Sequence, residues 1–357
     1  MKKIIAYICV FLGLLAMFIS QESITNRIWQ WNNIHVNSNA FFGKQSYEGG
    51  GLSGMAYLDD VKLFNDTKNF TFKKPIDNNI KNIDLYLFGD SFTEDIPDSA
   101  FCNTDYFTYN NYTKTLNYDL DKTKINILII EVSERLIFER YNNYIIFERL
   151  KKDSLSITPK LKKKYEVNTT LQIRNTVKNP YSQMMNKNLE YILFDYNFIN
   201  WVKRLKADMN YYLFNRATGS AVISNNKQFL FYKPTIDPQS TNCIYRQISN
   251  KEVNGIVTVL NEIYSHYLNE GFSEVYFSII PDPAAILQPE NYNNLVPQIY
   301  NNKLLKMPVL DVYSLFFKQD NPQILFRHGD THWNNNGMQI WLQLVNDELR
   351  KISSSKK

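Results

Sequence analysis

Two stretches of the chain carry residues that could perform nucleophilic chemistry. The first is an apolar run over residues 85–88, which is followed directly by Gly89, Asp90 and Ser91. A buried strand that ends in a tight turn is typical of folds that present a nucleophilic serine at the edge of a sheet. Gly89 permits such a turn. We expect Ser91 to begin the next helix, where free N–H groups and the helix dipole favour negative charge.

The second stretch lies near the C-terminus and contains Asp330 and His332, with Thr331 between them. A serine hydroxyl is a weak nucleophile at neutral pH, so it needs a base within hydrogen-bond reach and a group that orients that base. His332 fits the base and Asp330 the orienting group. Taken singly, Ser91 also fits a turn or helix cap, and the other two also fit a polar loop. Together they predict a Ser-His-Asp triad.

The two stretches resemble the SGNH (GDSL-like) hydrolase superfamily. The resemblance rests on the Gly-Asp-Ser block at 89–91 and on the Asp-Thr-His-Trp-Asn string at 330–334, which is followed by Gly337. The string is more narrowly similar to the alginate O-acetyltransferase branch, and the resemblance covers about residues 84–135 and 251–350. Two features depart from the pattern. The Asp-x-His motif follows the serine here instead of preceding it, and no clear Gly and Asn blocks for an oxyanion hole are present.

The resemblance implies a three-layer α/β/α fold with a parallel sheet, and a catalytic triad of Ser91, Asp330 and His332. It implies an extracytoplasmic O-acyltransferase, most simply an O-acetyltransferase, that modifies a cell-surface or secreted polysaccharide. Because acetyl-coenzyme A is cytoplasmic, the resemblance also implies a membrane-bound O-acyltransferase partner that hands over the acyl group. It requires no cofactor and no metal.

Four residues beside the triad are candidates for oxyanion stabilisation or substrate binding: Asp90, Arg135, Trp333 and Asn334. Trp333 directly follows the base. Its ring would form the base of an acceptor subsite or, alternatively, anchor the final helix in the core. Arg135 interests us because a guanidinium would stabilise an oxyanion where the usual Asn block is missing. The alternative for Arg135 is a surface salt pair with Glu134.

The run 125–132 is rich in β-branched residues and predicts a central parallel strand. In open α/β sheets the carboxyl ends of the strands face the site. The end of this strand therefore adds Glu131 and Ser133 to Arg135 as further site candidates.

The C-terminal half predicts alternating helices and strands. Ser249 and Glu252 form a capping-box pattern before an amphipathic helix that ends at Gly271. Strands are expected at 275–280 and 309–312, and the last helix begins just after His332. This order predicts parallel pairing through right-handed crossovers. By contrast, residues 102–112 are expected to form a loop or a short helix.

The N-terminus carries Lys2 and Lys3 before an uncharged apolar run at 4–20. Such a run is typical of a signal peptide or a membrane anchor. Because no A-x-A-like cleavage site follows it, we favour an uncleaved single-pass anchor over a cleaved signal or a buried core helix. The catalytic part would then lie in the periplasm or extracytoplasmic space, attached to the inner (plasma) membrane.

The remaining chain is expected to divide into a juxtamembrane lead-in at 23–82 and a catalytic domain at 83–357, with an insertion or cap at 136–248. The anchor occupies 1–22. The net charge of +5 is small and scattered, which argues against a nucleic-acid partner.

Three cysteines are present, of which Cys9 lies in the apolar run. Cys102 and Cys243 could form a disulfide in an oxidising compartment. Neither has a metal-ligand neighbour, so we expect no metal site.

Three functions remain open. The first is O-acyl transfer to a glycan through an acyl-serine intermediate. The second is a carbohydrate acetyl esterase with the same triad, in which water replaces the sugar. The third is a non-catalytic glycan-binding or assembly subunit, against which the complete set of Ser91, Asp330 and His332 argues. The anchor favours the transferase, because a degradative esterase gains less from attachment beside a membrane partner.

Overall fold

The chain forms two compact units. One comprises Met1–Asp60 and Tyr165–Gly219, and the other comprises Val61–Lys164 and Ser220–Lys357. The predicted lead-in at 23–82 and the predicted insertion at 136–248 lie in part outside the residues that the structure describes. This structure is a computed structural model, and it describes residues 2–20, 24, 51–58, 70–72, 75, 82–142, 145–152 and 197–355.

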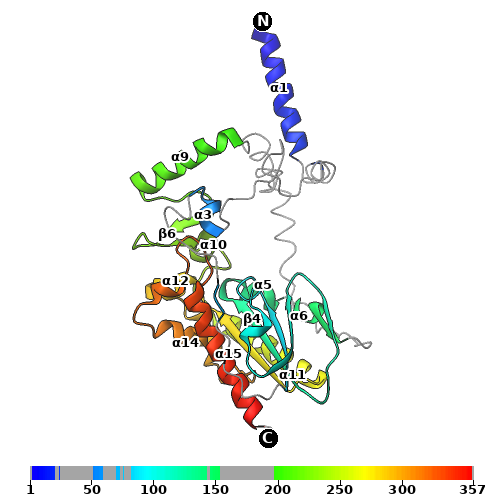
Figure 1. Ribbon diagram of the computed structural model, residues 1–357. Coiled ribbons are helices and arrows are strands. Elements are labelled where there is room, and N and C mark those ends of the chain that lie inside the picture. The colour runs from blue at the N-terminus through cyan, green and yellow to red at the C-terminus, as the bar shows by residue number, and fades with distance from the viewer. Residues whose placement is uncertain are drawn as a thin grey trace. The chain divides into compact units, whose positions relative to one another are not determined.

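The second unit is built on a parallel sheet of four strands (Figure 1). The strand order is β2-β1-β4-β8, and every neighbouring pair is parallel. The predicted mixed α/β fold with a parallel sheet is therefore confirmed. The three strands expected around the two motifs are present. The bounds of the four strands are β1 Ile83–Gly89, β2 Thr104–Asn111, β4 Ile125–Ser133 and β8 Glu274–Ile280.

The expectation of a loop or short helix at 102–112 is wrong, because this segment forms the edge strand β2. Only one residue of β2 is buried, whereas all of β1 and β4 are buried. An edge strand pairs on one side only, so it tolerates the Thr, Asp and Asn residues that obscure a strand pattern. The strand is therefore identified by its pairing with β1 and not by its own sequence pattern.

Helix α15 (Asn335–Ser355) covers one face of the sheet. Trp341 Nε1 donates a hydrogen bond to Ser278 Oγ at 3.0 Å, and the Tyr276 hydroxyl donates to Glu348 at 3.1 Å. Because Tyr276 and Ser278 are two positions apart on β8, they point to the same face. The helix directly after the predicted motif thus packs on the strand farthest from β2.

The opposite face is covered by α5 (Ile137–Asn142) and α11 (Asn250–Glu270). Phe277, whose side chain points away from α15, packs edge-on against Tyr141 of α5 with ring centroids 5.4 Å apart. Helices α5 and α11 contact each other. The parallel sheet is therefore flanked by helices on both faces.

The predicted amphipathic helix is confirmed as α11, with both ends as expected. Ser249 Oγ accepts a hydrogen bond from the Glu252 N–H, and the Glu252 side chain accepts one from the Ser249 N–H, which completes the capping box. Gly271 ends the helix with φ of 113°, a left-handed conformation that favours glycine. Local sequence signals alone determine these two ends.

The short strand expected at 309–312 is reduced to a single parallel bridge between Val309 and Phe277. Asp311 instead caps the next helix, because its side chain accepts the Ser314 N–H at 2.9 Å. The remaining described elements of this unit are η1 Asp98–Ala100, β3 Leu116–Tyr118, η2 Glu134–Leu136, α6 Ile145–Arg149, β5 Leu150–Lys152, β6 Ala221–Ile223, β7 Leu230–Tyr232, α10 Lys233–Ile236, α12 Pro283–Leu287, η3 Pro289–Asn291, α13 Leu295–Tyr300, α14 Val312–Phe317 and η4 Pro322–Leu325.

The other unit contains three described helices: α1 Lys2–Ile19, α3 Gly51–Met55 and α9 Asn197–Phe214. Across the described ranges, no helix combines the length and the apolarity that crossing a membrane requires.

Cys102 and Cys243 are both buried with free thiols, so the disulfide considered above is not formed. Cys102 Sγ instead donates to the Asn346 carbonyl at 3.3 Å, and the Asn346 side chain accepts the Cys102 N–H at 2.7 Å. Cys243 Sγ accepts the Tyr245 N–H at 3.4 Å. Both thiols are therefore part of local hydrogen bonding inside the fold.

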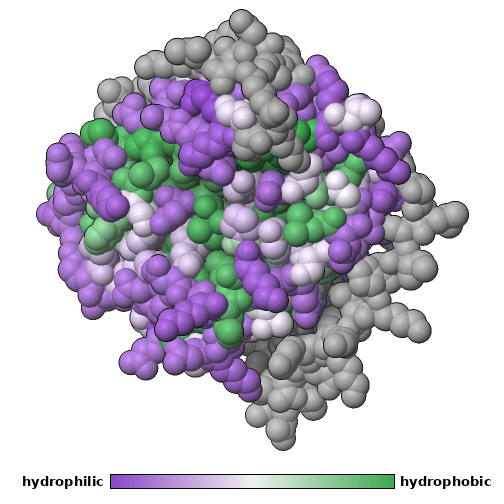
Figure 2. All heavy atoms as spheres, turned by 90° about the horizontal axis from the view of Figure 1, so that it is seen from below, coloured by the Kyte–Doolittle hydropathy of each residue, from purple (hydrophilic) through white to green (hydrophobic). Residues whose placement is uncertain are grey.

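On the face shown in Figure 2, hydrophobic side chains form small areas between hydrophilic ones.

Candidate active site

The turn that carries Ser91 begins where β1 ends at Gly89. No helix starts at Ser91: residues 91–95 form consecutive turns, and the expectation of a helix there is wrong. The Thr93 N–H donates to the Asp90 carbonyl at 3.2 Å, and the Ile96 N–H donates to the Thr93 carbonyl at 3.2 Å. The Asp90 side chain also takes the Phe92 N–H at 3.1 Å. Such a side-chain bond offers the backbone an alternative to the helix.

Gly89 is required by the close approach of two polar side chains. A Cβ atom at this position would lie 2.3 Å from Thr93 Oγ1 and 2.7 Å from Glu131 Oε2. These two groups are themselves joined, because Thr93 Oγ1 donates to Glu131 Oε2 at 2.9 Å. The turn therefore packs directly against the buried end of β4, and only a residue without a side chain fits.

Asp90 lies beneath the turn, and its carboxylate accepts backbone hydrogen bonds. Besides the Phe92 N–H, its carboxylate accepts the Ser133 N–H at 2.9 Å through Oδ2. Its own N–H donates to Glu131 Oε2 at 2.9 Å, and its carbonyl accepts the Tyr109 hydroxyl at 2.8 Å. With all these groups engaged, Asp90 positions the nucleophile turn and does not present a group to a substrate.

Ser91 lies where the order of the strands reverses. From β1 the chain goes first to β2 on one side and then returns to β4 on the other side. Ligands of open α/β sheets bind outside the carboxyl ends of the strands at such a switch point. Ser91 follows β1, and Arg135 follows β4, so both extend from the two strands that flank the switch point.

Asp330 and His332 lie on a hairpin-like loop that closes in front of α15. The Arg327 N–H donates to the His332 carbonyl at 3.0 Å, the Asn334 N–H donates to the Leu325 carbonyl at 2.8 Å, and Phe326 forms an antiparallel bridge with Trp333. These bonds fix both sides of the loop. The polar turn at 328–331 between them carries Asp330.

The structure brings the three predicted residues together in one hydrogen-bonded chain. Ser91 Oγ lies 2.8 Å from His332 Nε2, and His332 Nδ1 lies 3.1 Å from Asp330 Oδ2. Ser91 is exposed, and the His332 side chain is 23% exposed. The arrangement can transfer a proton from the serine to the imidazole while the carboxylate fixes the tautomer of the ring.

The environment of Asp330 favours its charged form. Burial by itself would raise the pKa of the Asp330 carboxyl, but the hydrogen bond and charge of His332, the Thr331 N–H and the Arg327 guanidinium together lower it. Arg327 Nη1 lies 3.6 Å from Asp330 Oδ2. Arg327 was not among the predicted site residues, although its spacing of three residues from Asp330 was a usable signal.

Phe92 supports the imidazole and was also missed. Its ring centroid lies 4.6 Å from that of His332 and 5.3 Å from that of Trp333, with the latter pair edge-on. The Arg135 guanidinium lies over the same ring, 5.7 Å from its centroid. Phe92 thus contacts both the base and Arg135, and no local pattern around Ser91 indicated this role.

Trp333 and Asn334 occupy structural positions. Trp333 has no exposed surface and packs against Trp341 of α15, with ring centroids 5.9 Å apart. The Asn334 side chain caps the start of α15: its Oδ1 accepts the Asn336 N–H at 2.9 Å, and its Nδ2 donates to the Ile324 carbonyl at 2.8 Å. Of the two interpretations of Trp333, this position favours the core anchor.

The candidates for an oxyanion site are the Ser91 backbone and Arg135. Among the described residues, none accepts a hydrogen bond from the Ser91 N–H. Arg135 is half-buried beside Phe92. The surface salt pair that we considered for Arg135 is not formed, because Glu134 is 2% exposed and its carboxylate bonds to Asp282 and Tyr292.

Two buried glutamates lie under the carboxyl end of β4. Burial, followed by the nearby charge of Asp90, raises the pKa of Glu131 well above its ordinary value. Burial also raises the pKa of Glu134 to about 8, although the Tyr292 hydroxyl and the Asp282 N–H donate to its carboxylate at 2.6 and 3.0 Å. Both carboxyl groups therefore keep their protons to a higher pH than an exposed glutamate does.

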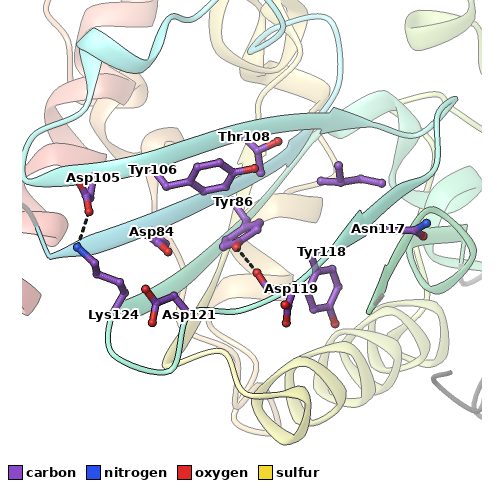
Figure 3. Close-up of a pocket in the computed structure, with 11 residues that line it drawn as sticks. Asp84, Tyr86, Asp105, Tyr106, Thr108, Asn117, Tyr118, Asp119, Asp121 and Lys124 are labelled. Carbon is purple, nitrogen blue, oxygen red and sulfur yellow. Dashed lines mark hydrogen bonds and ion pairs between the residues drawn. The ribbon is translucent and has the colours of Figure 1, made fainter. Parts of the chain in front are cut away.

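A separate cavity of about 480 Å³ lies at the other end of the sheet (Figure 3). It opens at the amino ends of β1 and β2, whereas Ser91 follows the carboxyl end of β1. Its excess of carboxylates disfavours an anionic ligand, and Lys124 forms an ion pair with Asp105 inside it. No group of side chains in the described ranges is arranged to hold a metal ion. The cavity is lined by Asp84, Tyr86, Asp105, Tyr106, Thr108, Leu116, Asn117, Tyr118, Asp119, Asp121 and Lys124.

Comparisons of the chain with protein-family models, with curated proteins and with solved structures find no match.

Proposed function

We propose that this chain is an extracytoplasmic serine O-acyltransferase that modifies a polysaccharide, with acetyl as the transferred group. The observation that supports the proposal is the chain of contacts from Ser91 Oγ to His332 Nε2 at 2.8 Å and from His332 Nδ1 to Asp330 Oδ2 at 3.1 Å. The resemblance to SGNH hydrolases, and to the alginate O-acetyltransferase branch within them, supplies the substrate class.

In the first half of the reaction, Ser91 Oγ attacks the acyl carbonyl carbon of the donor while His332 Nε2 takes the hydroxyl proton. The backbone N–H of Ser91 stabilises the oxyanion that forms, and the Asp330 carboxylate stabilises the imidazolium. The tetrahedral intermediate then expels the donor group, which leaves with the proton from His332. The product of this half-reaction is an acyl ester on Ser91.

In the second half, a sugar hydroxyl attacks the acyl-Ser91 carbonyl and gives its proton to His332. Collapse of the second tetrahedral intermediate releases the acylated sugar, and His332 returns its proton to Ser91 Oγ. Atoms and charges balance without a cofactor or a metal. The proposed donor is a membrane-bound O-acyltransferase, and the proposed location is the outer side of the inner membrane, with residues 1–22 as the anchor.

The second candidate is a carbohydrate acetyl esterase, in which water attacks the same acyl-enzyme. The exposure of Ser91 favours this candidate, since a transferase must keep water poorly placed while it holds the acceptor. A glycan-binding subunit without catalysis is the third candidate, and an inert Ser91 would favour it.

Labelling with a serine-directed fluorophosphonate tests the nucleophile. We expect the full chain to label at Ser91, and we expect Ser91→Ala and His332→Ala to lose labelling. The control Ser99→Ala, at an exposed position in η1, should label like wild type. Equal labelling of Ser91→Ala and wild type would remove the acyl-enzyme from the proposal.

Mass spectrometry of an oligosaccharide acceptor then separates the transferase from the esterase. Incubation with an activated acetyl ester should yield acetylated sugar with wild type and none with Ser91→Ala. If the enzyme removes acetyl groups from an acetylated glycan and never adds them, the esterase replaces the transferase.

A further inference from the structure

Helix α9 presents its large apolar residues to the outside. Trp201 is 63% exposed, Leu205 51% and Leu213 65%. With 3.6 residues per turn, six of the seven large apolar residues that are exposed in the described part of this helix fall within about a third of its circumference. The seventh, Phe214, is the last residue of the helix and lies outside this sector. We call this set the apolar stripe of α9, and it consists of Trp201, Val202, Leu205, Met209, Tyr212 and Leu213.

The opposite side of α9 faces the protein. Ala207 is 2% exposed, and it lies away from the stripe. Lys203, on the same side as Ala207, donates from Nζ to the Tyr57 hydroxyl at 3.0 Å and lies 4.9 Å from the centroid of the Tyr57 ring. An amphipathic helix of a globular protein normally turns its apolar face inward. In α9 the side that carries Ala207 and Lys203 is covered, whereas the apolar stripe is exposed.

The charges of α9 fit an anionic surface. The helix carries Lys203, Arg204 and Lys206 against Asp208 as its only acidic residue, a net charge of +2 from three positive and one negative side chains. Lys206 is exposed and flanks the stripe. Basic residues beside an apolar stripe with Trp and Tyr are the pattern of helices that lie in the boundary between lipid headgroups and acyl chains.

We propose that α9 lies flat on a lipid surface, with its apolar stripe inserted at the headgroup boundary and the exposed Lys206 at anionic headgroups. Its 18 residues give a length of about 27 Å, and its charged residues keep it from crossing. This contact stands apart from the acyl-transfer proposal, because it rests on the exposure and charge of one helix. It holds the chain at the membrane independently of residues 1–22.

Fluorescence quenching by brominated acyl chains tests the contact at a single residue. The full chain is reconstituted into vesicles that contain an anionic phospholipid, with and without bromine on the acyl chains. Trp201 is one of five tryptophans, and Trp333 and Trp341 have no exposed surface. We expect bromolipid to remove about a fifth more of the tryptophan emission in wild type than in Trp201→Phe, because the other four tryptophans are the same in both chains. Equal bromolipid quenching of wild type and Trp201→Phe would overturn the proposal.

A pair of matched double variants tests the stripe while leaving Trp201 in place. Leu205→Glu with Leu213→Glu should abolish the Trp201 quenching, because two carboxylates cannot enter the boundary. Leu304→Glu with Phe317→Glu changes two comparably exposed apolar residues elsewhere and should leave the quenching intact. Circular dichroism confirms that both variants fold.

A protein that covers the stripe is the alternative occupant. In that case the purified wild-type chain shows no Trp201 quenching in vesicles, and the lipid proposal fails. Lys206→Glu gives a further check, since quenching should fall severalfold with anionic vesicles and change little with neutral ones.

Discussion

The carboxylate of Asp90 accepts the backbone N–H of Ser133 at 2.9 Å, and this bond joins the ends of two neighbouring strands. Asp90 follows β1 and Ser133 ends β4. The residue next to Asp90 is Ser91, so the position of the nucleophile depends on a bond to the adjacent strand. The Asp of the Gly-Asp-Ser block therefore has a physical task of its own.

Asp90→Asn should destabilise the fold and slow catalysis together. The amide nitrogen of Asn cannot accept the hydrogen bond of either Phe92 or Ser133, so one buried N–H loses its acceptor, at a cost of roughly 1–3 kcal/mol. Urea unfolding and fluorophosphonate labelling rates measure the two effects. Asp95→Asn, at an exposed position in the same turn, is the control. Labelling at the wild-type rate in Asp90→Asn would contradict the positioning role.

Gly89→Ala and Gly255→Ala should change stability in opposite directions. A Cβ at Gly89 meets Thr93 Oγ1 and Glu131 Oε2 at 2.3 and 2.7 Å, so these hydrogen-bonded side chains or the turn must shift, with an expected loss of about 1–3 kcal/mol. Gly255 lies inside α11 with no atom within 4 Å of its Cβ position, so alanine should add about 0.5–1 kcal/mol. Denaturant midpoints compare the two. Equal midpoints would show that the turn yields freely.

Asp330→Asn should lower acyl transfer by about 10⁴-fold while the chain stays folded, because Asn no longer holds the imidazole in the productive tautomer. The 3.1 Å contact between His332 Nδ1 and Asp330 Oδ2 is the basis of this expectation. Hydrolysis of a small activated acetyl ester provides the measurement, and the exposed Asp320→Asn is the control. A loss of less than tenfold would mean that Asp330 does not orient the base.

Stability should fall with rising pH because of Glu134. Its pKa is raised from 4.5 to about 8 in the folded chain, so the folded state binds more protons than the unfolded state between these values. The contribution of Glu134 to the free energy of unfolding is therefore greatest below pH 4.5. It decreases as the pH rises to about 8, by at most about 1.4 kcal/mol per pH unit.

Glu134→Gln removes this titration, so its unfolding free energy should depend less steeply on pH over the same window. Glu139→Gln, at an exposed position on the next helix, should keep the wild-type slope. Urea titrations at several pH values between 5 and 8 supply the slopes. Parallel slopes for wild type and Glu134→Gln would contradict the raised pKa.

Elements with strong local signals could be predicted from the sequence. The β-branched run of β4 and the capping box of α11 both identify structure from neighbouring residues, and each appears where it was expected. Ser91, Asp330 and His332 were selected as a set by residue type and chain order, since few other combinations satisfy the needs of a serine nucleophile.

The roles of several polar and aromatic side chains depend on contacts between residues far apart in the chain. Asp90 could have faced a substrate, but its partner is the N–H of Ser133 on another strand. Trp333 could have lined a cleft, but it is buried against Trp341. Edge strand β2 is likewise identified only by its parallel pairing with β1. The physical reason is that periodicity and caps act between residues close in the chain, whereas the partner of a polar or aromatic side chain is set by which strands and helices the fold brings side by side.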